Sequence, residues 1–142
     1  MKKSTKEWLT GILIGIILML LLTVKVVAAP LSEEDQELLT RTVYLEAGNQ
    51  DLKGKRLVLS VILNRVESEQ FPNTVREVLS QEGQFQTYKL LGNAQPTWTD
   101  ELAVKMETEG RLNTGVYFFR TGHYGCGDPL FQYGDHYFST LK

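Results

Sequence analysis

The chain has 142 residues, which is enough for one domain but too few for a two-domain enzyme with a nucleotide-binding half. Hydrophobic residues make up 42% of it and charged residues 23%, a balance that is typical of globular proteins and excludes a disordered or collagen-like chain. The formal net charge is −2, yet residues 31–142 carry 16 acidic and only 11 basic side chains. Because phosphate backbones attract a basic surface, we expect this acidic part to bind no nucleic acid.

The first 29 residues have the pattern of a targeting segment. Three lysines make residues 1–7 positive, and a nearly continuous apolar run follows over residues 9–24. This order is typical of a signal peptide. An uncleaved membrane anchor fits equally well, because residues 8–29 are long enough to cross a bilayer as one apolar helix. Both interpretations predict that residues 30–142 form a separate, extracytoplasmic domain.

The predicted domain opens with a helix over Glu33–Ala47. Ser32 is the expected N-cap, and acidic residues in the first turn favour the positive end of the helix dipole. Its apolar stripe consists of Leu39, Val43 and Ala47. Glu46 follows Val43 by three residues, so it is predicted to lie on the inward face of this helix.

Three further helices are expected. The segment from residue 52 or 53 to 66 is apolar on nearly every side, which predicts a central helix that is buried on several faces. A break at residues 71–74 precedes a short third helix, and residues 82–86 read as a loop. Thr99 is predicted to cap a fourth helix that ends at Gly110.

The C-terminal part of the chain changes from helical to β-prone sequence. A turn is expected at residues 113–115, a strand at 116–119 and a closing strand at 136–138, while residues 122–134 are rich in glycine and aromatics. We therefore predict an α+β, mainly helical fold with a small C-terminal β lobe, preceded by one N-terminal apolar helix.

Glu46 is the strongest catalytic candidate on physical grounds. A carboxylate on the apolar face of a helix is desolvated, which raises its pKa and keeps a proton available near neutral pH. A general acid needs such a proton. The alternative is a structural ion pair, with Arg41 or Arg65 as the partner, because such pairs also perturb carboxylates.

Several short blocks occur in an order that resembles one protein family. They are T-V-Y-L-E-A-G-N at 42–49, G-K-R-L-V-L-S-V-I-L-N-R-V at 54–66, F-P-N-T-V at 71–75, Q-F at 84–85 and G-D-H-Y-F at 134–138. Together they resemble the SleB/CwlJ family of bacterial cell-wall hydrolases. The blocks I-L-N-R-V and F-P-N-T-V are the most specific part of the likeness, which spans nearly all of residues 31–142.

The resemblance implies a peptidoglycan-cleaving enzyme, from a family known best for hydrolysis of the spore cortex. It implies a fold similar to a small lysozyme or lytic transglycosylase, with Glu46 as the catalytic residue and the cell wall as the place of action. Many members carry a second acid in an E-A-R-G-E block, whereas this chain has Gln50 at that position.

A single acid is chemically sufficient for a lytic transglycosylase. Glycosidases of the standard type need two carboxylates, about 5–10 Å apart depending on the stereochemistry. With one, Glu46 is expected to protonate the bond between N-acetylmuramic acid and N-acetylglucosamine, and then to take a proton from the sugar's own 6-hydroxyl. The candidates for a second acid are Asp51, Glu67 and Asp135, each of which reads as a solvated charge.

Other residues are expected to bind the glycan strand or to support the site, without a metal or cofactor and in a monomer. The expected substrate-binding residues, whose alternative role is structural packing for the aromatics and histidine, are Gln84, Phe85, Tyr117, His136 and Tyr137. The expected supporting residues are Tyr44, Asn64 and Arg65.

Two other functions are compatible with the sequence. His123, Cys126, Asp128 and His136 form a loose group that suggests a zinc site or a cysteine nucleophile with a histidine base. Zinc ligands usually have tighter paired spacing, and Cys126 lies between glycines. It is the only cysteine, which excludes an internal disulfide. The second alternative is a module that binds peptidoglycan without cutting it.

Overall fold

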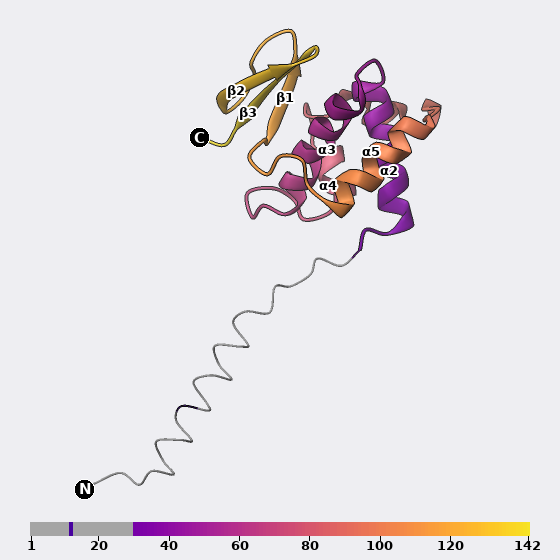
Figure 1. Ribbon diagram of the computed structural model, residues 1–142, viewed down its shortest axis with the longest axis horizontal. Helices are drawn as coiled ribbons and strands as arrows, with labels where there is room; N and C mark the ends of the chain where they lie inside the picture. The colour runs from indigo at the N-terminus through magenta and orange to yellow at the C-terminus, as the bar shows by residue number, and fades with distance from the viewer. Residues whose placement is uncertain (1–11, 13–29) are drawn as a thin grey trace, which may run out of the picture. The chain divides into compact units, whose positions relative to one another are not determined.

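The computed structural model describes Ile12 and residues 30–142 of the chain. The predicted leader lies outside the described residues apart from Ile12. Leu31–Lys142 forms one unit with eight elements, shown in Figure 1. In chain order they are α2 (Glu33–Ala47), α3 (Leu52–Val66), α4 (Val75–Ser80), the 3-10 helix η1 (Gln86–Asn93), α5 (Trp98–Glu109), β1 (Phe118–Thr121), β2 (Asp128–Tyr133) and β3 (His136–Thr140). Among the described residues, no helix combines the length and the apolar character needed to cross a membrane.

Helix α2 has the predicted bounds and the predicted cap. The Asp35 backbone N–H donates to Ser32 Oγ at 3.0 Å, which satisfies one of the free donors at the helix start. The apolar stripe of Leu39, Val43 and Ala47 is fully buried. These residues form one wall of the core.

Helix α3 is the central helix, as its apolar sequence predicts. Val58, Leu59, Val61 and Ile62 have no exposed surface, and α3 contacts α2, α4, α5 and β1. Asp51 caps it, with Oδ1 accepting from the Gly54 backbone N–H at 2.8 Å. A helix enclosed by four neighbours is a rigid base for side chains at its C-terminal end.

The helical region differs from the sequence prediction at two points. Helix α5 begins at Trp98 and is capped by Thr97 rather than Thr99, because the Asp100 carboxylate accepts from the Thr97 backbone N–H at 2.8 Å and closes a capping box. The 3-10 helix η1 was not predicted. None of its residues is fully buried, and a 3-10 helix has a tighter period than the α-helical spacing by which the other helices were recognised.

The C-terminal residues form a three-stranded antiparallel sheet in the order β1-β3-β2, beside the helices in Figure 1. Strand β1 begins two residues later than predicted, because the preceding Val116 is buried in the core instead of pairing. Strand β2 was not predicted, since it is largely exposed and has an irregularity between Pro129 and Phe131. The rings of Phe131 and Phe138 stack with centroids 5.2 Å apart and join the sheet to the core.

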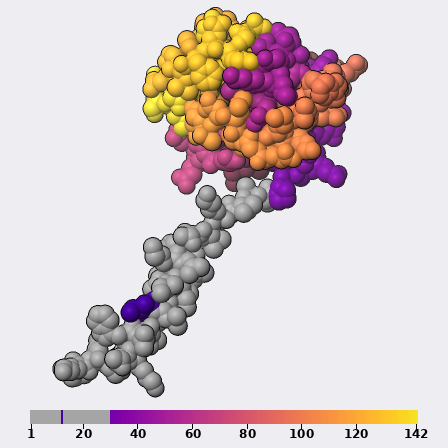
Figure 2. Space-filling model, in the orientation of Figure 1, coloured from indigo at the N-terminus to yellow at the C-terminus, as the bar shows by residue number. Residues whose placement is uncertain are grey.

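Side chains at the two ends of α3 attach the sheet to the helices. At the C-terminal end, Asn64 Nδ2 donates to the carbonyl of Val116 at 2.8 Å, directly before β1. At the N-terminal end, the Tyr133 hydroxyl donates to Asp51 at 2.8 Å, and Gln50 Nε2 donates to Asp135 at 2.9 Å. In Figure 2 the yellow surface of the C-terminal strands accordingly lies against the purple surface of the α2–α3 connection.

A buried ion pair makes the contact between α3 and α5 sensitive to mutation. Lys55 Nζ lies 2.7 Å from Asp100 Oδ1, and both side chains are almost completely buried. Removing one partner leaves an uncompensated buried charge. We expect Asp100→Ala to lower the free energy of unfolding by about 3–5 kcal/mol in urea denaturation. The control Glu109→Ala, exposed on the same helix, should change it by about 0.5 kcal/mol or less. Equal losses in the two variants would contradict this account.

Candidate active site

A cleft of about 440 Å³ lies where the ends of α2 and α3 meet the sheet. Its walls come from five segments of the chain that are far apart in sequence. The lining residues are Glu46 of α2, Arg65 of α3, residues 83–87, residues 118–121 of β1, and Gly125 and Cys126 of the β1–β2 loop. A concave site with a few convergent polar groups is the usual form of a ligand-binding or catalytic site.

Glu46 is the only carboxylate among the residues that line this cleft. It lies in the last turn of α2, where its side chain is half-buried, and its Oε1 accepts a hydrogen bond from the Thr87 hydroxyl. Burial raises the pKa of Glu46 above its ordinary value, and the side-chain and backbone hydrogen bonds from Thr87 oppose this only in part. The carboxyl group is therefore able to hold a proton nearer neutral pH than an exposed glutamate does.

The alternative prediction, an ion pair between Glu46 and Arg41 or Arg65, is not found among the described residues. Arg41 lies 2.9 Å from Glu37, one turn earlier on the same helix, and its Nη1 donates to the carbonyl of Leu91. Arg65 points to other partners. Within residues 30–142, Glu46 takes part in no salt bridge.

Arg65 lines the same cleft as Glu46 and is buried without a carboxylate partner of its own among the described residues. Its Nε donates to the carbonyl of Tyr117 at 2.7 Å and its Nη2 to Gln84 Oε1 at 3.0 Å. Burial lowers its pKa to about 10, so it remains charged at neutral pH. Three aromatic rings at 5.0–5.5 Å compensate part of the lost hydration, those of Phe71, Phe85 and Phe118.

This geometry links Arg65 to Gln84, a predicted substrate-binding residue. Because the Gln84 oxygen is occupied by Arg65, the amide NH2 group is free to donate within the cleft. Phe85, also predicted to bind substrate, lines the same cleft and packs against Phe119 with ring centroids 6.1 Å apart. The structure thus brings Glu46, Arg65, Gln84 and Phe85 together.

The remaining predicted site residues lie outside the cleft lining. Tyr117 stacks on Phe71 with ring planes 9° apart, and Tyr137 meets Tyr124 edge-on with centroids 5.1 Å apart. Asn64 is buried and holds the segment before β1. Tyr44 lies half-buried on α2.

His136 packs against residues of the site without lining the cleft itself. It is buried at the start of β3, its ring meets Phe119 edge-on at 5.2 Å, and it contacts the backbone of Glu46. Burial lowers the pKa of His136 below its ordinary value, although the Asp135 charge and the Glu46 backbone oppose this shift. The folded protein therefore favours the neutral imidazole.

Sequence reasoning missed several residues of the cleft. The most important is Thr87, which contacts Glu46 directly but lies 41 positions away in the sequence. The others are Gly83, Gln86, Phe118, Phe119, Arg120, Thr121 and Gly125, whereas Cys126 was considered only for the zinc or cysteine alternative. The position of Thr87, two residues after the Q-F block, was the one available signal, and it indicates proximity to a conspicuous motif but no role.

The three candidates for a second acid are all engaged outside the cleft. Asp51 caps α3 and accepts from Tyr133, and hydrogen bonds from Gly54 and Tyr133 lower its pKa. Glu67 pairs with Arg111 at 2.8 Å. Asp135 accepts from the Asn49 and Gln50 side-chain amides at 2.9 Å each. A two-carboxylate site is therefore not formed by these residues.

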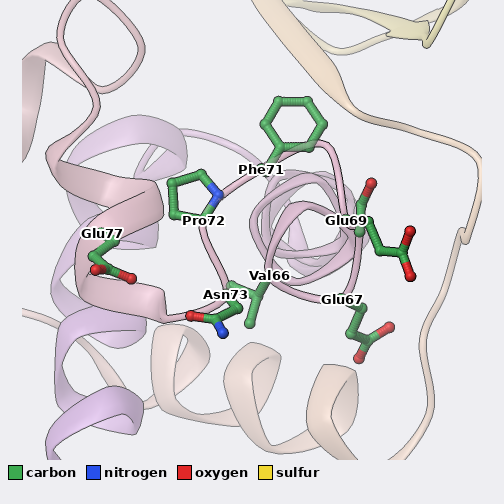
Figure 3. A pocket seen from close by; sticks show the side chains of 8 residues that line it. Val66, Glu67, Glu69, Phe71, Pro72, Asn73 and Glu77 are labelled. Atoms are coloured by element: carbon green, nitrogen blue, oxygen red, sulfur yellow. The ribbon is translucent and has the colours of Figure 1, made fainter.

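A second hollow of about 590 Å³ lies beyond the end of α3 and contains three carboxylates. Figure 3 shows Glu77 on one side of Phe71 and Pro72, with Glu67 and Glu69 on the other, so the three groups do not converge. Glu77 is engaged by Thr74 at 2.7 Å. This hollow is larger than the cleft, but it lacks a buried acid, and we regard the cleft as the candidate active site.

The residues of the zinc hypothesis do not form a ligand set. Across Ile12 and residues 30–142, no three His, Cys, Asp or Glu side chains lie close enough together to hold one metal ion. Cys126 is exposed and lines the cleft, whereas His136 is buried beneath Phe119.

Comparisons with known proteins assign the family. The family model described as "Cell Wall Hydrolase" matches residues 49–139, nearly two thirds of the chain. The chain belongs to the cell wall hydrolase family. The matched region begins three residues after Glu46, so the family match does not itself include the candidate acid. A search of curated proteins found no match.

Two solved structures resemble this cell wall hydrolase. The catalytic domain of the germination-specific lytic transglycosylase SleB from Bacillus anthracis is 27% identical with a TM-score of 0.70, and the match covers 80% of this chain and all of that one. The catalytic domain of Bacillus cereus SleB is 26% identical with a TM-score of 0.68, covering 77% and 91%. The predicted mainly helical, lytic-transglycosylase-like fold is confirmed by these matches.

The buried His136 predicts that stability depends on pH. Because its pKa is lowered in the folded state, His136 contributes stability that is present above its ordinary value of 6.5 and is lost as the pH falls. We expect the free energy of unfolding of His136→Gln to vary less between about pH 7 and pH 5 than that of the wild type. The raised pKa of Glu46 changes stability with pH in the opposite direction. Glu46 is present in both proteins, so its contribution to the pH dependence is the same in each.

The control is His123→Gln, which changes the only other histidine, an exposed one. It should retain the wild-type pH dependence in urea denaturation. A His136→Gln variant with the full wild-type dependence would contradict the assignment.

Proposed function

We propose that the protein cleaves peptidoglycan glycan strands between N-acetylmuramic acid and N-acetylglucosamine as a lytic transglycosylase, with Glu46 as general acid and then general base. The observation that carries this proposal is the single carboxylate of the cleft, half-buried and unpaired with a cation. The family supports peptidoglycan as the substrate, and the similar Bacillus anthracis domain is described as a lytic transglycosylase.

The proton balance of the reaction requires one group that works in both directions. Protonated Glu46 donates to the glycosidic oxygen while the bond from that oxygen to C1 of the muramic sugar breaks. The resulting carboxylate takes the proton of the 6-hydroxyl as its oxygen bonds to C1, which closes a 1,6-anhydro ring and restores the acid. A hydrolase would instead need a second carboxylate at about 5–10 Å to act as nucleophile or to activate water.

The cleft offers contacts for a neutral, hydroxyl-rich chain with amide substituents. The free Gln84 NH2 group is suited to the carbonyl of an N-acetyl substituent. Phe85 lines the cleft but is only 5% exposed, so we assign its ring to the wall of the cleft rather than to stacking on a sugar. We assign Tyr117, Tyr137 and His136 to packing around the cleft rather than to substrate contact. Tyr44, Asn64 and Arg65 are proposed to support the site.

We further propose that the apolar leader carries the catalytic domain out of the cytoplasm, as a cleaved signal or as an anchor at residues 8–29. Peptidoglycan is extracytoplasmic, so a domain that cuts it must be exported. The positive start and the long apolar run of the sequence supply the features that export requires. We propose that the domain acts as a monomer.

Replacing the proposed acid should abolish glycan cleavage while leaving the fold intact. Glu46→Gln keeps the shape of the side chain but removes its transferable proton, and general acid–base catalysis typically contributes about 10²–10⁴-fold to rate. We expect the release of soluble muropeptides from purified peptidoglycan to fall by about this factor. Mass spectrometry of the wild-type products should show 1,6-anhydromuramic ends.

The matched control is Glu82→Gln, the same substitution at an exposed position outside the cleft lining. It should release muropeptides at the wild-type rate. Undiminished release by Glu46→Gln would refute the role of this residue. Binding of the wild type to peptidoglycan without any release would instead identify a non-catalytic binding module.

A further inference from the structure

We propose that Thr87 is a positioning residue that fixes the Glu46 carboxyl group, holding Oε1 as a hydrogen-bond acceptor so that Oε2 carries the transferable proton. This inference rests on the proposed role of Glu46 as general acid and base. It assigns a function to a cleft residue that neither the sequence motifs nor the family match distinguishes. The geometry that carries it is the direct contact between the two side chains.

The Thr87 hydroxyl contacts one oxygen of the Glu46 carboxyl group, and this difference between the two oxygens matters for catalysis. The Thr87 hydroxyl donates to Oε1, and the backbone N–H of the same residue also acts as a donor to the Glu46 carboxyl group. A backbone N–H can only donate, so Thr87 presents a donor to the carboxyl group whichever way its hydroxyl turns. No side chain in residues 30–142 donates a hydrogen bond to Oε2. We accordingly place the proton of the acid form on Oε2, the oxygen that the Thr87 hydroxyl does not contact.

Thr87 is held firmly enough to serve this purpose. It is the second residue of η1, where the backbone N–H groups of the first turn have no partner within the helix. The helix η1 packs against α2, and Arg41 of α2 donates to the Leu91 carbonyl of η1 at 3.0 Å. The donor and the acid are thus on elements that are tied to each other.

The same contact serves both protonation states of the acid. With Glu46 protonated on Oε2, Oε1 is the carbonyl oxygen and accepts from Thr87. After Glu46 has given up its proton, the bond from the hydroxyl becomes charge-assisted and therefore stronger. Thr87 lowers the pKa of Glu46 and thereby limits the increase that burial causes. Thr87 therefore stabilises the carboxylate form of Glu46, which acts as the base, and keeps the carboxyl group in the orientation that the acid form needs.

Other charged and titratable groups near the carboxyl group come from three elements. They are Arg65 of α3, Arg120 and Cys126 from β1 and its following loop, and His136 of β3. None of them hydrogen-bonds to the Glu46 side chain within the described region. A substitution of Thr87 leaves all of them in place, so its effect on the titration of Glu46 is separable from theirs.

The test compares Thr87→Val, which keeps the shape but removes the hydroxyl, with Thr87→Ser, which retains it. We expect kcat for muropeptide release to fall by about ten- to a hundredfold in Thr87→Val, as for loss of a hydrogen bond to a charged group, and to be largely restored in Thr87→Ser. The pH profile gives a second readout. Because the acid form is the active one, activity declines as pH rises through the pKa of Glu46. Loss of the hydroxyl raises this pKa, so the alkaline limb should move to higher pH in Thr87→Val.

Direct titration of Glu46 separates this inference from the proposed function. The full chain is labelled with ¹³C at the glutamate carboxyl carbons, and the Glu46 resonance is identified by its absence in Glu46→Gln. We expect its titration midpoint to rise in Thr87→Val and to stay near the wild-type value in Thr87→Ser. Thr121→Val, in the same cleft but without a bond to Glu46, controls for a general loss of polarity and should leave the midpoint unchanged.

The outcomes are distinguishable. If the midpoint and the pH profile of Thr87→Val equal those of the wild type while Glu46→Gln is inactive, the positioning role is wrong and the proposed function stands. If the wild type releases no muropeptides but the midpoint rises in Thr87→Val, the contact is as proposed and the transglycosylase function is wrong. Thr87→Ala removes the same hydroxyl with less bulk and replaces Thr87→Val should the latter fail to fold.

Discussion

The carboxyl group of Glu46 is half-buried at the end of α2 without a cation paired to it, and the site depends on this one constraint. Desolvation raises its pKa, and the two donors of Thr87 oppose that change. An ion pair with the neighbouring Arg65 would have stabilised the carboxylate and removed the proton near neutral pH. Instead Arg65 is engaged by Tyr117, Gln84 and aromatic rings, so no cation offsets the increase in the Glu46 pKa that burial causes.

Arg65 and its neighbour Asn64 explain how a three-stranded sheet can form one wall of a precise site. A small, largely exposed sheet has little core of its own. The two side chains leave the end of the most buried helix and donate to carbonyls just before β1, at Tyr117 and Val116. Four elements enclose α3 and hold it rigidly. Its hydrogen bonds therefore also fix the position of the segment that leads into β1. The burial of a positive charge in Arg65 is the cost of this arrangement.

The sequence predicted those parts of the molecule whose cause is local. Helix α2 with its Ser32 cap and the central helix α3 follow from apolar periodicity and capping, and Glu46 was recognised as an inward-facing acid. The parts that it missed depend on contacts between distant segments. Thr87 comes from a 3-10 helix without fully buried residues, and β2 forms by pairing with β3. Tyr117 and Tyr137, predicted to bind substrate, contact the rings of Phe71 and Tyr124 outside the cleft lining, and residue type alone does not reveal such contacts.

The central claim is that one carboxylate suffices because no water enters the reaction, and isotope labelling tests this most directly. Purified peptidoglycan is digested by the protein in H₂¹⁸O, and the new muramic ends are analysed by mass spectrometry. Attack by the sugar's own 6-hydroxyl predicts 1,6-anhydro ends that contain no ¹⁸O. Reducing ends that each carry one ¹⁸O atom would contradict the account, because they would require a water activated by a second group that the cleft does not contain.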